Sequence, residues 1–230
     1  VARQYSGTLG KVANCQVVVS AHYVADEPTS RAPIHWPMTA QLYLPEAWAT
    51  DPARRTTVPI PTENALQTKP ALALALIDQA RAWGVPFAWV VADTVYGTGE
   101  VEMALRRAGK AYVLGVNATS QFNSWGTRPL VAGTAAEIAS TLDPAAWRRL
   151  SAGVGAKGER LFDWAYLELA DLEAAEYNQS LSGLWTRGLL IRRNIADGDL
   201  AFFTTWCPAG TGMETLVAVE GRRWAIEDGF

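Results

Sequence analysis

The spacing of apolar residues along the chain separates predicted strands from predicted helices. Residues 87–92 and 111–116 are almost continuously apolar, which predicts strands that are buried on both faces of a sheet. Residues 69–83 are rich in Ala and Leu, with a proline in the first turn and a glycine directly after, and predict a helix. A second helix is expected over residues 99–108. This alternation predicts a mixed α/β sheet with right-handed crossovers.

The chain before this alternation is predicted to contain two strands and a loop. Residues 14–24 are rich in β-branched side chains, and residues 39–44 alternate polar and apolar side chains, so both segments predict strands. Several prolines break up residues 45–61, which predicts a loop with short helical turns.

The pattern changes after residue 116, where we expect a β-rich insertion. Residues 134–142 and 144–150 predict short helices, and residues 151–160 predict a flexible, glycine-rich loop. Three antiparallel strands are predicted at residues 161–169, 188–193 and 200–206. A last helix is predicted from about Met213 to the end of the chain.

The composition is that of a folded domain with a sizeable core. Hydrophobic residues make up 49% of the chain and charged residues 19%, which excludes wholesale disorder. A net charge of −3 argues against a dedicated nucleic-acid-binding protein, because phosphate contacts normally need an excess of Lys and Arg. Basic flanking segments outside the chain would remove this objection. The chain opens at Val1 without a Met and stops soon after its last helix begins, so we expect a fragment.

Cysteine usage and hydropathy indicate the compartment. Cys15 and Cys207 are far apart and lack metal-ligand spacing, so we expect buried thiols in a cytosolic protein. The sequence has no signal-peptide pattern and no apolar run of about eighteen residues, so we expect neither secretion nor membrane insertion. The predicted location is the cytoplasm.

Two acidic residues are candidates for a metal site. Asp93 ends the apolar run of residues 87–92, and Glu227 lies in the last helix close to Arg222 and Arg223. An acid that leaves a buried strand and an acid on a late helix can meet at one metal ion. The residues alone also allow Asp93 to be a turn residue and Glu227 to be a solvated side chain paired with Arg223.

Basic residues near the predicted insertion are candidates for DNA contacts. Lys157 and Arg160 lie in the glycine-rich loop, whose backbone could approach DNA closely, although a solvated loop is the alternative. Arg192 and Arg193 end an apolar strand, and alternation places them on opposite faces, so at most one of them points at DNA.

Seven stretches, in order along the chain, resemble the catalytic domain of bacterial insertion-sequence transposases of the DDE superfamily. The similarity is to the branch whose last acid lies in a Tyr-Arg-Glu-Lys signature. The stretches are RQYSGTLGKVANCQVVVSAHYV (3–24), QLYLPEAWATD (41–51), TKPALALALIDQARAWGVP (68–86), WVVADTVYG (89–97), SAGVGAKGERLFDWAYLEL (151–169), GLLIRRN (188–194) and GRRWAIEDGF (221–230).

The resemblance implies an RNase H-like fold and a site with two Mg²⁺ ions, or Mn²⁺ in their place, held by three carboxylates. Asp93 matches the second Asp, and Glu227 matches the Glu. The first Asp of the family is expected upstream of residue 3. Arg223 matches the signature Arg, whereas Glu220 stands where the signature usually has Tyr. Arg222 and Arg223 could clamp DNA phosphates near the metal ions, with ordinary surface ion pairing as the alternative.

The resemblance also implies a division of the chain into three parts. Residues 1–116 would form the first part of the RNase H-like core, residues 117–208 a β-rich insertion, and residues 209–230 the start of the catalytic helix. Within the insertion, Trp164 and Trp185 are candidates for stacking a flipped base, with an ordinary core position as the alternative.

The implied function is Mg²⁺-dependent DNA cleavage and strand transfer at insertion-sequence ends. The partners would be double-stranded DNA, as terminal inverted repeats and target, and a second copy of the protein in a synaptic complex. The resemblance also implies a bacterial protein that associates with the nucleoid. Without the first Asp, we expect the fragment alone to be inactive. One alternative is an inert transposase remnant that keeps the fold and DNA binding, and another is an unrelated α/β ligand-binding domain.

Overall fold

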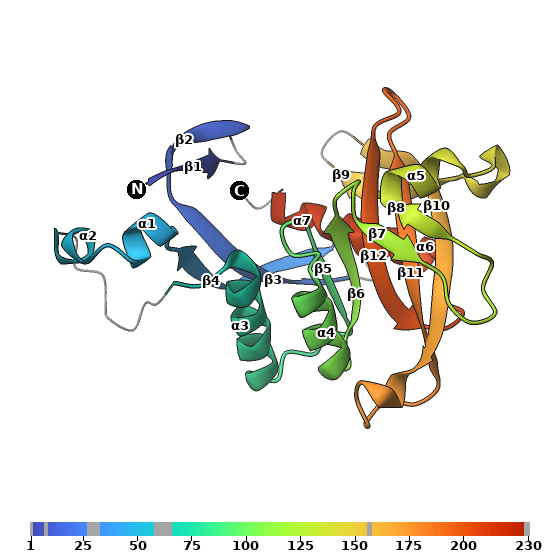
Figure 1. The fold of residues 1–230 in the computed structure, drawn as a ribbon, viewed down its shortest axis with the longest axis horizontal. Coiled ribbons are helices and arrows are strands. Elements are labelled where there is room, and N and C mark those ends of the chain that lie inside the picture. Colours follow the sequence, from blue (N-terminus) through green and yellow to red (C-terminus); the bar gives the residue numbers. More distant parts are fainter. Residues whose placement is uncertain (1, 7–8, 27–32, 58–65, 156–157, 228–230) are drawn as a thin grey trace. The chain divides into compact units, whose positions relative to one another are not determined.

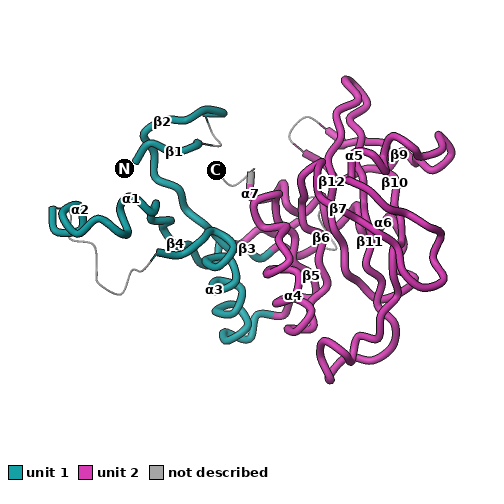
Figure 2. The backbone as a smooth tube through the Cα atoms, viewed as in Figure 1, with its two compact units in different colours: residues 1–23, 37–85 teal, residues 24–36, 86–230 magenta. Residues whose placement is uncertain are grey.

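The computed structural model describes residues 2–6, 9–26, 33–57, 66–155 and 158–227 (Figure 1). The chain divides into two compact units (Figure 2). Residues 1–23 and 37–85 form the first unit, and residues 24–36 and 86–230 form the second. Among the described residues, every helix is too short or too polar to cross a lipid bilayer.

In the described part of the first unit, short strands combine with helices. The antiparallel pair of β1 (Ala2–Ser6) and β2 (Lys11–Cys15) opens it. The predicted helix is α3 (Lys69–Ala82), which begins where the hydroxyl of Thr68 accepts a hydrogen bond from the amide of Ala71. It ends before Gly84, whose φ of 71° suits a residue without a side chain.

The predicted loop and the two early strands are also present. The short helices α1 (Glu46–Ala49) and α2 (Pro52–Thr57) lie within residues 45–61, as expected. The strand predicted at residues 14–24 is interrupted at Gln16: its first two residues end β2, and the rest corresponds to β3 (Val17–Ala25). The strand predicted at residues 39–44 corresponds to β4 (Ile34–Tyr43), which pairs with β3 in a two-stranded sheet.

A six-stranded mixed sheet is the centre of the second unit. Its strand order is β5-β6-β12-β11-β10-β9, in which β5 and β6 are parallel and the other neighbours are antiparallel. The strands are β5 (Trp89–Ala92), β6 (Ala111–Val116), β9 (Arg148–Gly155), β10 (Gly158–Glu173), β11 (Leu184–Arg193) and β12 (Leu200–Pro208). Strands β9, β10, β11 and β12, which lie within residues 117–208, therefore continue the sheet that β5 and β6 begin. The division at residues 116 and 208 stays a prediction.

Helices cover both faces of this sheet. Ile138 of α5 (Ala135–Ser140) packs in the same cluster as Ile191 of β11. The next residue along β11, Arg192, pairs with α6 (Met213–Arg222). Neighbouring residues of a strand point to opposite faces, so α5 and α6 lie on opposite faces. The mixed sheet between helices confirms the predicted RNase H-like α/β class (Figure 1).

Smaller elements complete the second unit. Helix α4 (Gly99–Arg107) begins at Thr98, whose hydroxyl accepts from the amide of Val101. The other short elements are β7 (Gln121–Asn123), β8 (Ala132–Thr134), the 3-10 turns at Pro144–Ala146 and Ala174–Glu176, and α7 (Trp224–Glu227).

Two predictions for the middle of the chain are wrong. Residues 144–150 contain one 3-10 turn and then enter β9 instead of forming a helix. The described part of 151–160 is not a loop but belongs to β9 and β10, which pair from Gly155 with Gly158 onward. Ala152 is completely buried in this pair, so packing against the rest of the unit outweighs the low strand propensity of the glycines.

Two further predictions need correction. Strand β5 is only half-buried, because it is the edge strand of the six-stranded sheet and lacks a second neighbour within it. The predicted last helix is two helices, α6 and α7, separated by a turn at Arg223. At this turn the hydrogen bonds tighten, with Arg223 N–H donating to Glu220 O and Ile226 N–H to Arg223 O, both at 3.1 Å.

Candidate active site

Asp93 lies at the carboxyl end of β5, where the chain turns sharply. Its Oδ1 accepts a hydrogen bond from Val95 N–H at 3.0 Å, and its carbonyl oxygen accepts from Tyr96 N–H at 3.1 Å. The residue is exposed to solvent. Burial raises the pKa of Tyr96, and the nearby charge of Asp93 raises it further. The local turn therefore holds the carboxylate at the sheet edge with its side chain reachable from solvent.

Two glycines allow the loop after Asp93 to lie directly on β6. A Cβ atom added at Gly97 would lie 1.8 Å from the carbonyl oxygen of Gly115. A Cβ added at Gly115 would lie 2.8 Å from the amide nitrogen of Thr94. Side chains at either position would push the loop away from the strand, so both glycines help to place Asp93.

The chemistry of Asp93 fits one ligand of a magnesium site. Mg²⁺ prefers oxygen ligands and is usually bound through one or two carboxylates with water completing the shell. Within the described ranges, no group of three or more His, Cys, Asp or Glu side chains gathers that could hold a metal ion. Glu227 is the last residue of α7, and its side chain falls outside the described part of the structure. The pairing of Asp93 with Glu227 stays a prediction.

The end of α6 carries a buried acid. The side chain of Glu220 has an exposed fraction of 0%. Its Oε1 accepts a hydrogen bond from Arg192 Nη1 at 3.1 Å, and Arg223 Nε lies 3.9 Å from the same oxygen. A buried carboxylate is costly unless it is paired, and these two guanidinium groups supply the pairing.

Trp224 begins α7 in a setting of arginine side chains. The guanidinium carbons of Arg160, Arg192 and Arg223 lie 5.3, 5.9 and 5.2 Å from the centre of its ring system. Cation–π attraction acts over this range. Two of the predicted basic residues, Arg160 and Arg223, therefore meet at one aromatic side chain.

The other predicted basic residues make different contacts. Arg222 forms an ion pair with Asp26. Arg193 lies on the opposite face from Arg192, as alternation predicts, where it pairs with Asp163 at 3.2 Å. Its guanidinium carbon also lies 4.2 Å from the centre of the Trp147 ring. Lys157 falls outside the described residues.

Arg160 makes main-chain contacts in addition to its contact with Trp224. Its Nη2 donates to Ala152 O at 2.9 Å and to Gly221 O at 3.0 Å. The first carbonyl belongs to β9 and the second to the last turn of α6. This arginine thus ties a strand of the sheet to the end of the helix.

The structure places both stacking candidates in the core. Trp164 is 0% exposed, and Trp185 is 8% exposed. Neither ring presents a face to solvent in this conformation, which agrees with the alternative that they are core residues.

The sequence alone did not indicate the burial of Glu220. In the sequence, Glu220 stood out only as a departure from the signature tyrosine. The helical spacing of the buried residues Leu216, Val217 and Glu220 was the available signal, because positions three and four apart share a face.

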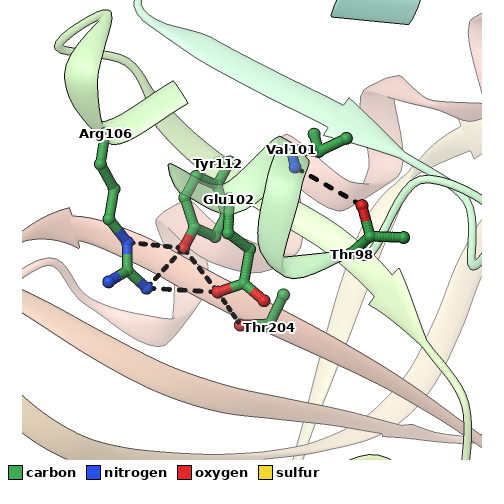
Figure 3. A network of polar contacts seen from close by, with 6 residues as sticks. All are labelled: Thr98, Val101, Glu102, Arg106, Tyr112 and Thr204. Carbon is green, nitrogen blue, oxygen red and sulfur yellow. Dashed lines mark hydrogen bonds and ion pairs between the residues drawn. The ribbon is translucent and has the colours of Figure 1, made fainter. Parts of the chain in front are cut away.

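A second buried polar network lies at the opposite end of β6 from Asp93. The hydroxyl of Tyr112 accepts from Arg106 Nε at 3.0 Å and donates to Glu102 Oε2 at 2.9 Å (Figure 3). Arg106 also lies 4.6 Å from the centre of the Trp206 ring, and Thr204 donates to Glu102 at 3.4 Å. Burial raises the pKa of Tyr112 well above its usual range, and the charge of Glu102 adds to this. The network joins α4 to the sheet.

Comparison with protein families gives one match. The model described as DDE superfamily endonuclease matches residues 1–137, a range that contains Asp93 and ends before Glu227. A search of curated proteins finds no match to the chain.

Proposed function

The chain belongs to the DDE superfamily endonuclease family, and on this premise we propose that it forms the catalytic domain of a DNA transposase. The proposed reactions are Mg²⁺-dependent cleavage and strand transfer at the ends of an insertion sequence. The observation that carries the proposal is Asp93, an exposed carboxylate fixed by a turn at the end of β5, inside the range that the family model matches.

The proposed mechanism assigns metal binding to two acidic residues. Asp93 and Glu227 would hold the metal ions, of which Mg²⁺ is the expected species and Mn²⁺ a substitute. When bound, two such ions activate the attacking oxygen and stabilise the leaving oxygen of a phosphodiester. The contribution of the chain is positioning: the amide of Val95 orients one oxygen of Asp93, and Gly97 keeps the loop against β6.

The proposed DNA contacts are made by basic residues of the second unit. Arg222, Arg223 and Arg193 are each partly exposed, so they remain able to reach phosphate groups. Arg160 and Lys157 keep the same proposed role from the sequence, and Arg160 in addition has the main-chain contacts described above. The proposed partners are double-stranded DNA, as element ends and target, and a second copy of the protein that brings two ends together.

Replacement of Asp93 by Asn tests the proposal. In the complete gene product, incubated with Mg²⁺ and DNA that carries both element ends, we expect Asp93→Asn to reduce cleavage to background and to leave end binding unchanged. The matched control is Asp197→Asn. Asp197 is also exposed, and its Oδ1 accepts from the amide two residues ahead at 3.0 Å, as Asp93 does.

The outcomes separate the proposed enzyme from its alternatives. Cleavage by the Asp93→Asn variant at the wild-type rate would refute the metal role. A wild-type protein that binds the ends but never cleaves them would identify an inert remnant. Failure of the wild-type protein to bind DNA at all would point to an unrelated function.

A further inference from the structure

We propose that Glu220, Arg160, Arg192 and Arg223 are positioning residues that hold helix α7 through Trp224, and so place Glu227 at the metal site. We call these five residues, Trp224 included, the Trp224 cluster. The inference rests on the proposed function, because it takes Glu227 as a metal ligand. It goes beyond that function by assigning a role to residues of β10 and β11, far from Glu227 in the sequence.

The first argument is the length of α7. Trp224–Glu227 is a helix of four residues, separated from α6 by the turn at Arg223. Isolated helices this short are unstable in water, because the first hydrogen-bonded turn costs more conformational entropy than its bonds return. In addition to the main-chain bonds at the Arg223 turn, the orientation of α7 therefore depends on side chains around it, and Trp224 is its first residue.

The second argument is the buried carboxylate of Glu220. It lies in the last turn of α6, is fully buried, and is bonded to Arg192 of β11 while Arg223 lies close by. Because one carboxylate serves two guanidinium groups, it links the sheet to the turn between the helices. Removal of its charge would leave both arginines without this shared anion in a site that is largely shielded from water.

The third argument is the close contact between α6 and β9. A Cβ atom added at Gly221 would lie 2.0 Å from the carbonyl oxygen of Ala152. Arg160 reinforces this contact, because its Nη2 donates to the carbonyl oxygens of both residues. The end of α6 is thus fixed on the sheet, one residue before Arg222 and three before Trp224.

The fourth argument is the number of cations around one ring. Arg160, Arg192 and Arg223 come from β10, β11 and the interhelical turn, and all three lie within 6 Å of the Trp224 ring centre. The arginines of β10 and β11 thereby connect the indole, and with it the start of α7, to two strands of the sheet. Glu227 follows Trp224 by less than one helical turn, so its main chain is positioned by the same contacts.

The test compares two glutamates of α6 in the complete gene product. Glu220→Gln removes the buried charge while keeping the side-chain shape. The matched control is Glu214→Gln on the same helix, where Glu214 is 57% exposed; it breaks an ion pair with Arg148 of β9. Three quantities are measured: amide hydrogen exchange of the peptide that contains α7, the Mg²⁺ concentration for half-maximal DNA cleavage, and the affinity for element ends in Ca²⁺.

We expect Glu220→Gln to accelerate exchange in α7 and to raise the half-maximal Mg²⁺ concentration by about tenfold, which is typical when a partner of a metal ligand is lost. Its DNA affinity should stay close to wild type, and Glu214→Gln should match wild type in all three measurements. If Glu220→Gln only lowers the melting temperature and leaves the metal requirement of the folded variant unchanged, its role is merely structural. That result would overturn the inference.

Two other results would also overturn the inference. Wild-type exchange in α7 together with a wild-type metal requirement would show that the cluster does not position the helix. Loss of DNA affinity at an unchanged metal requirement would show that the cluster supports only the proposed DNA contacts of Arg160 and Arg223 and does not position the helix. Should Glu220→Gln fail to fold, Trp224→Leu gives the same test, since it removes the aromatic ring without leaving a buried charge unpaired.

The test also distinguishes failure of the inference from failure of the proposed function. Amide exchange in α7 reports positioning without any metal or DNA. If Asp93→Asn still cleaves DNA, the proposed function fails whatever the exchange result. If Asp93→Asn is inactive but Glu220→Gln behaves as wild type, only the positioning role fails.

Discussion

The main chain of Gly115 lies so close to Gly97 that Gly97 has no room for a side chain. The carbonyl oxygen of Gly115 lies 1.8 Å from where a Cβ of Gly97 would be. This contact joins the loop that follows Asp93 to the neighbouring strand β6. The placement of the candidate metal ligand therefore depends on a backbone contact between two residues that are distant in the sequence.

We predict that Gly97→Ala destabilises the protein by about 2–3 kcal/mol, because a methyl group at this position must displace backbone. DNA cleavage should fall as well, since the loop that carries Asp93 has to move. The measurements are denaturant unfolding and the cleavage rate of the folded variant. Gly99→Ala is the control, because a Cβ there meets nothing within 4 Å. Equal stabilities of the two variants would contradict the prediction.

The buried network of α4 gives a second prediction. Tyr112→Phe removes the hydroxyl that lies between Arg106 and Glu102, and leaves their charged groups with unmet hydrogen bonds in the interior. We expect a loss of about 2 kcal/mol in the free energy of unfolding. Tyr5→Phe, at a tyrosine that is 60% exposed, should change this free energy little. A loss no greater than that of Tyr5→Phe would show that the network contributes nothing to stability.

The pair of Arg128 and Asp171 gives a prediction for acid stability. Hydrogen bonding to Arg128 holds the pKa of Asp171 below its ordinary value of 3.8, and Thr186 donates to the same carboxylate at 2.6 Å. A depressed pKa in the folded state adds stability above the unfolded value, and this is lost as the pH falls through the folded pKa. The stability difference between wild type and Arg128→Gln should therefore shrink as the pH falls below 3.8. If urea unfolding gives the same difference in free energy between the two proteins above and below this pH, the prediction is contradicted.

The proposed DNA contact of Arg193 can be tested through its salt dependence. Arg193→Gln should weaken binding to DNA of any sequence and lower the slope of log affinity against log salt by about one. Arg81→Gln serves as the control, because Arg81 is comparably exposed and lies in an ion pair on α3. An unchanged slope for Arg193→Gln would indicate that this arginine serves only its contacts with Asp163 and Trp147.

Local patterns in the sequence were enough to predict several elements and the placement of Asp93. The helices at residues 69–83 and 99–108 and the buried strand at 111–116 were predicted within a residue of their observed limits. Each has a regular apolar pattern and a clear end signal, so few contacts with the rest of the chain are needed to define it. The placement of Asp93 at a strand end follows from the same kind of pattern.

Other elements could not be predicted, because distant partners define them. The glycine-rich segment at residues 151–160 has weak strand propensity, and it becomes part of a β-hairpin because Ala152 packs in the interior. The break between α6 and α7 has no proline or glycine at Arg223 to announce it. In the structure this turn lies beside Glu220, which pairs with Arg192 of β11. This partner is distant in the sequence, so the local pattern does not reveal it.

Sequence patterns and the family resemblance were enough to predict the fold class and to identify the candidate acids. Only the tertiary structure showed that Glu220 is buried between arginines and that Trp224 meets three of them. The physical reason is that burial and pairing are properties of contacts between β10, β11 and α6. Such contacts depend on how strands are ordered in the sheet, which hydrophobic periodicity within one segment does not encode.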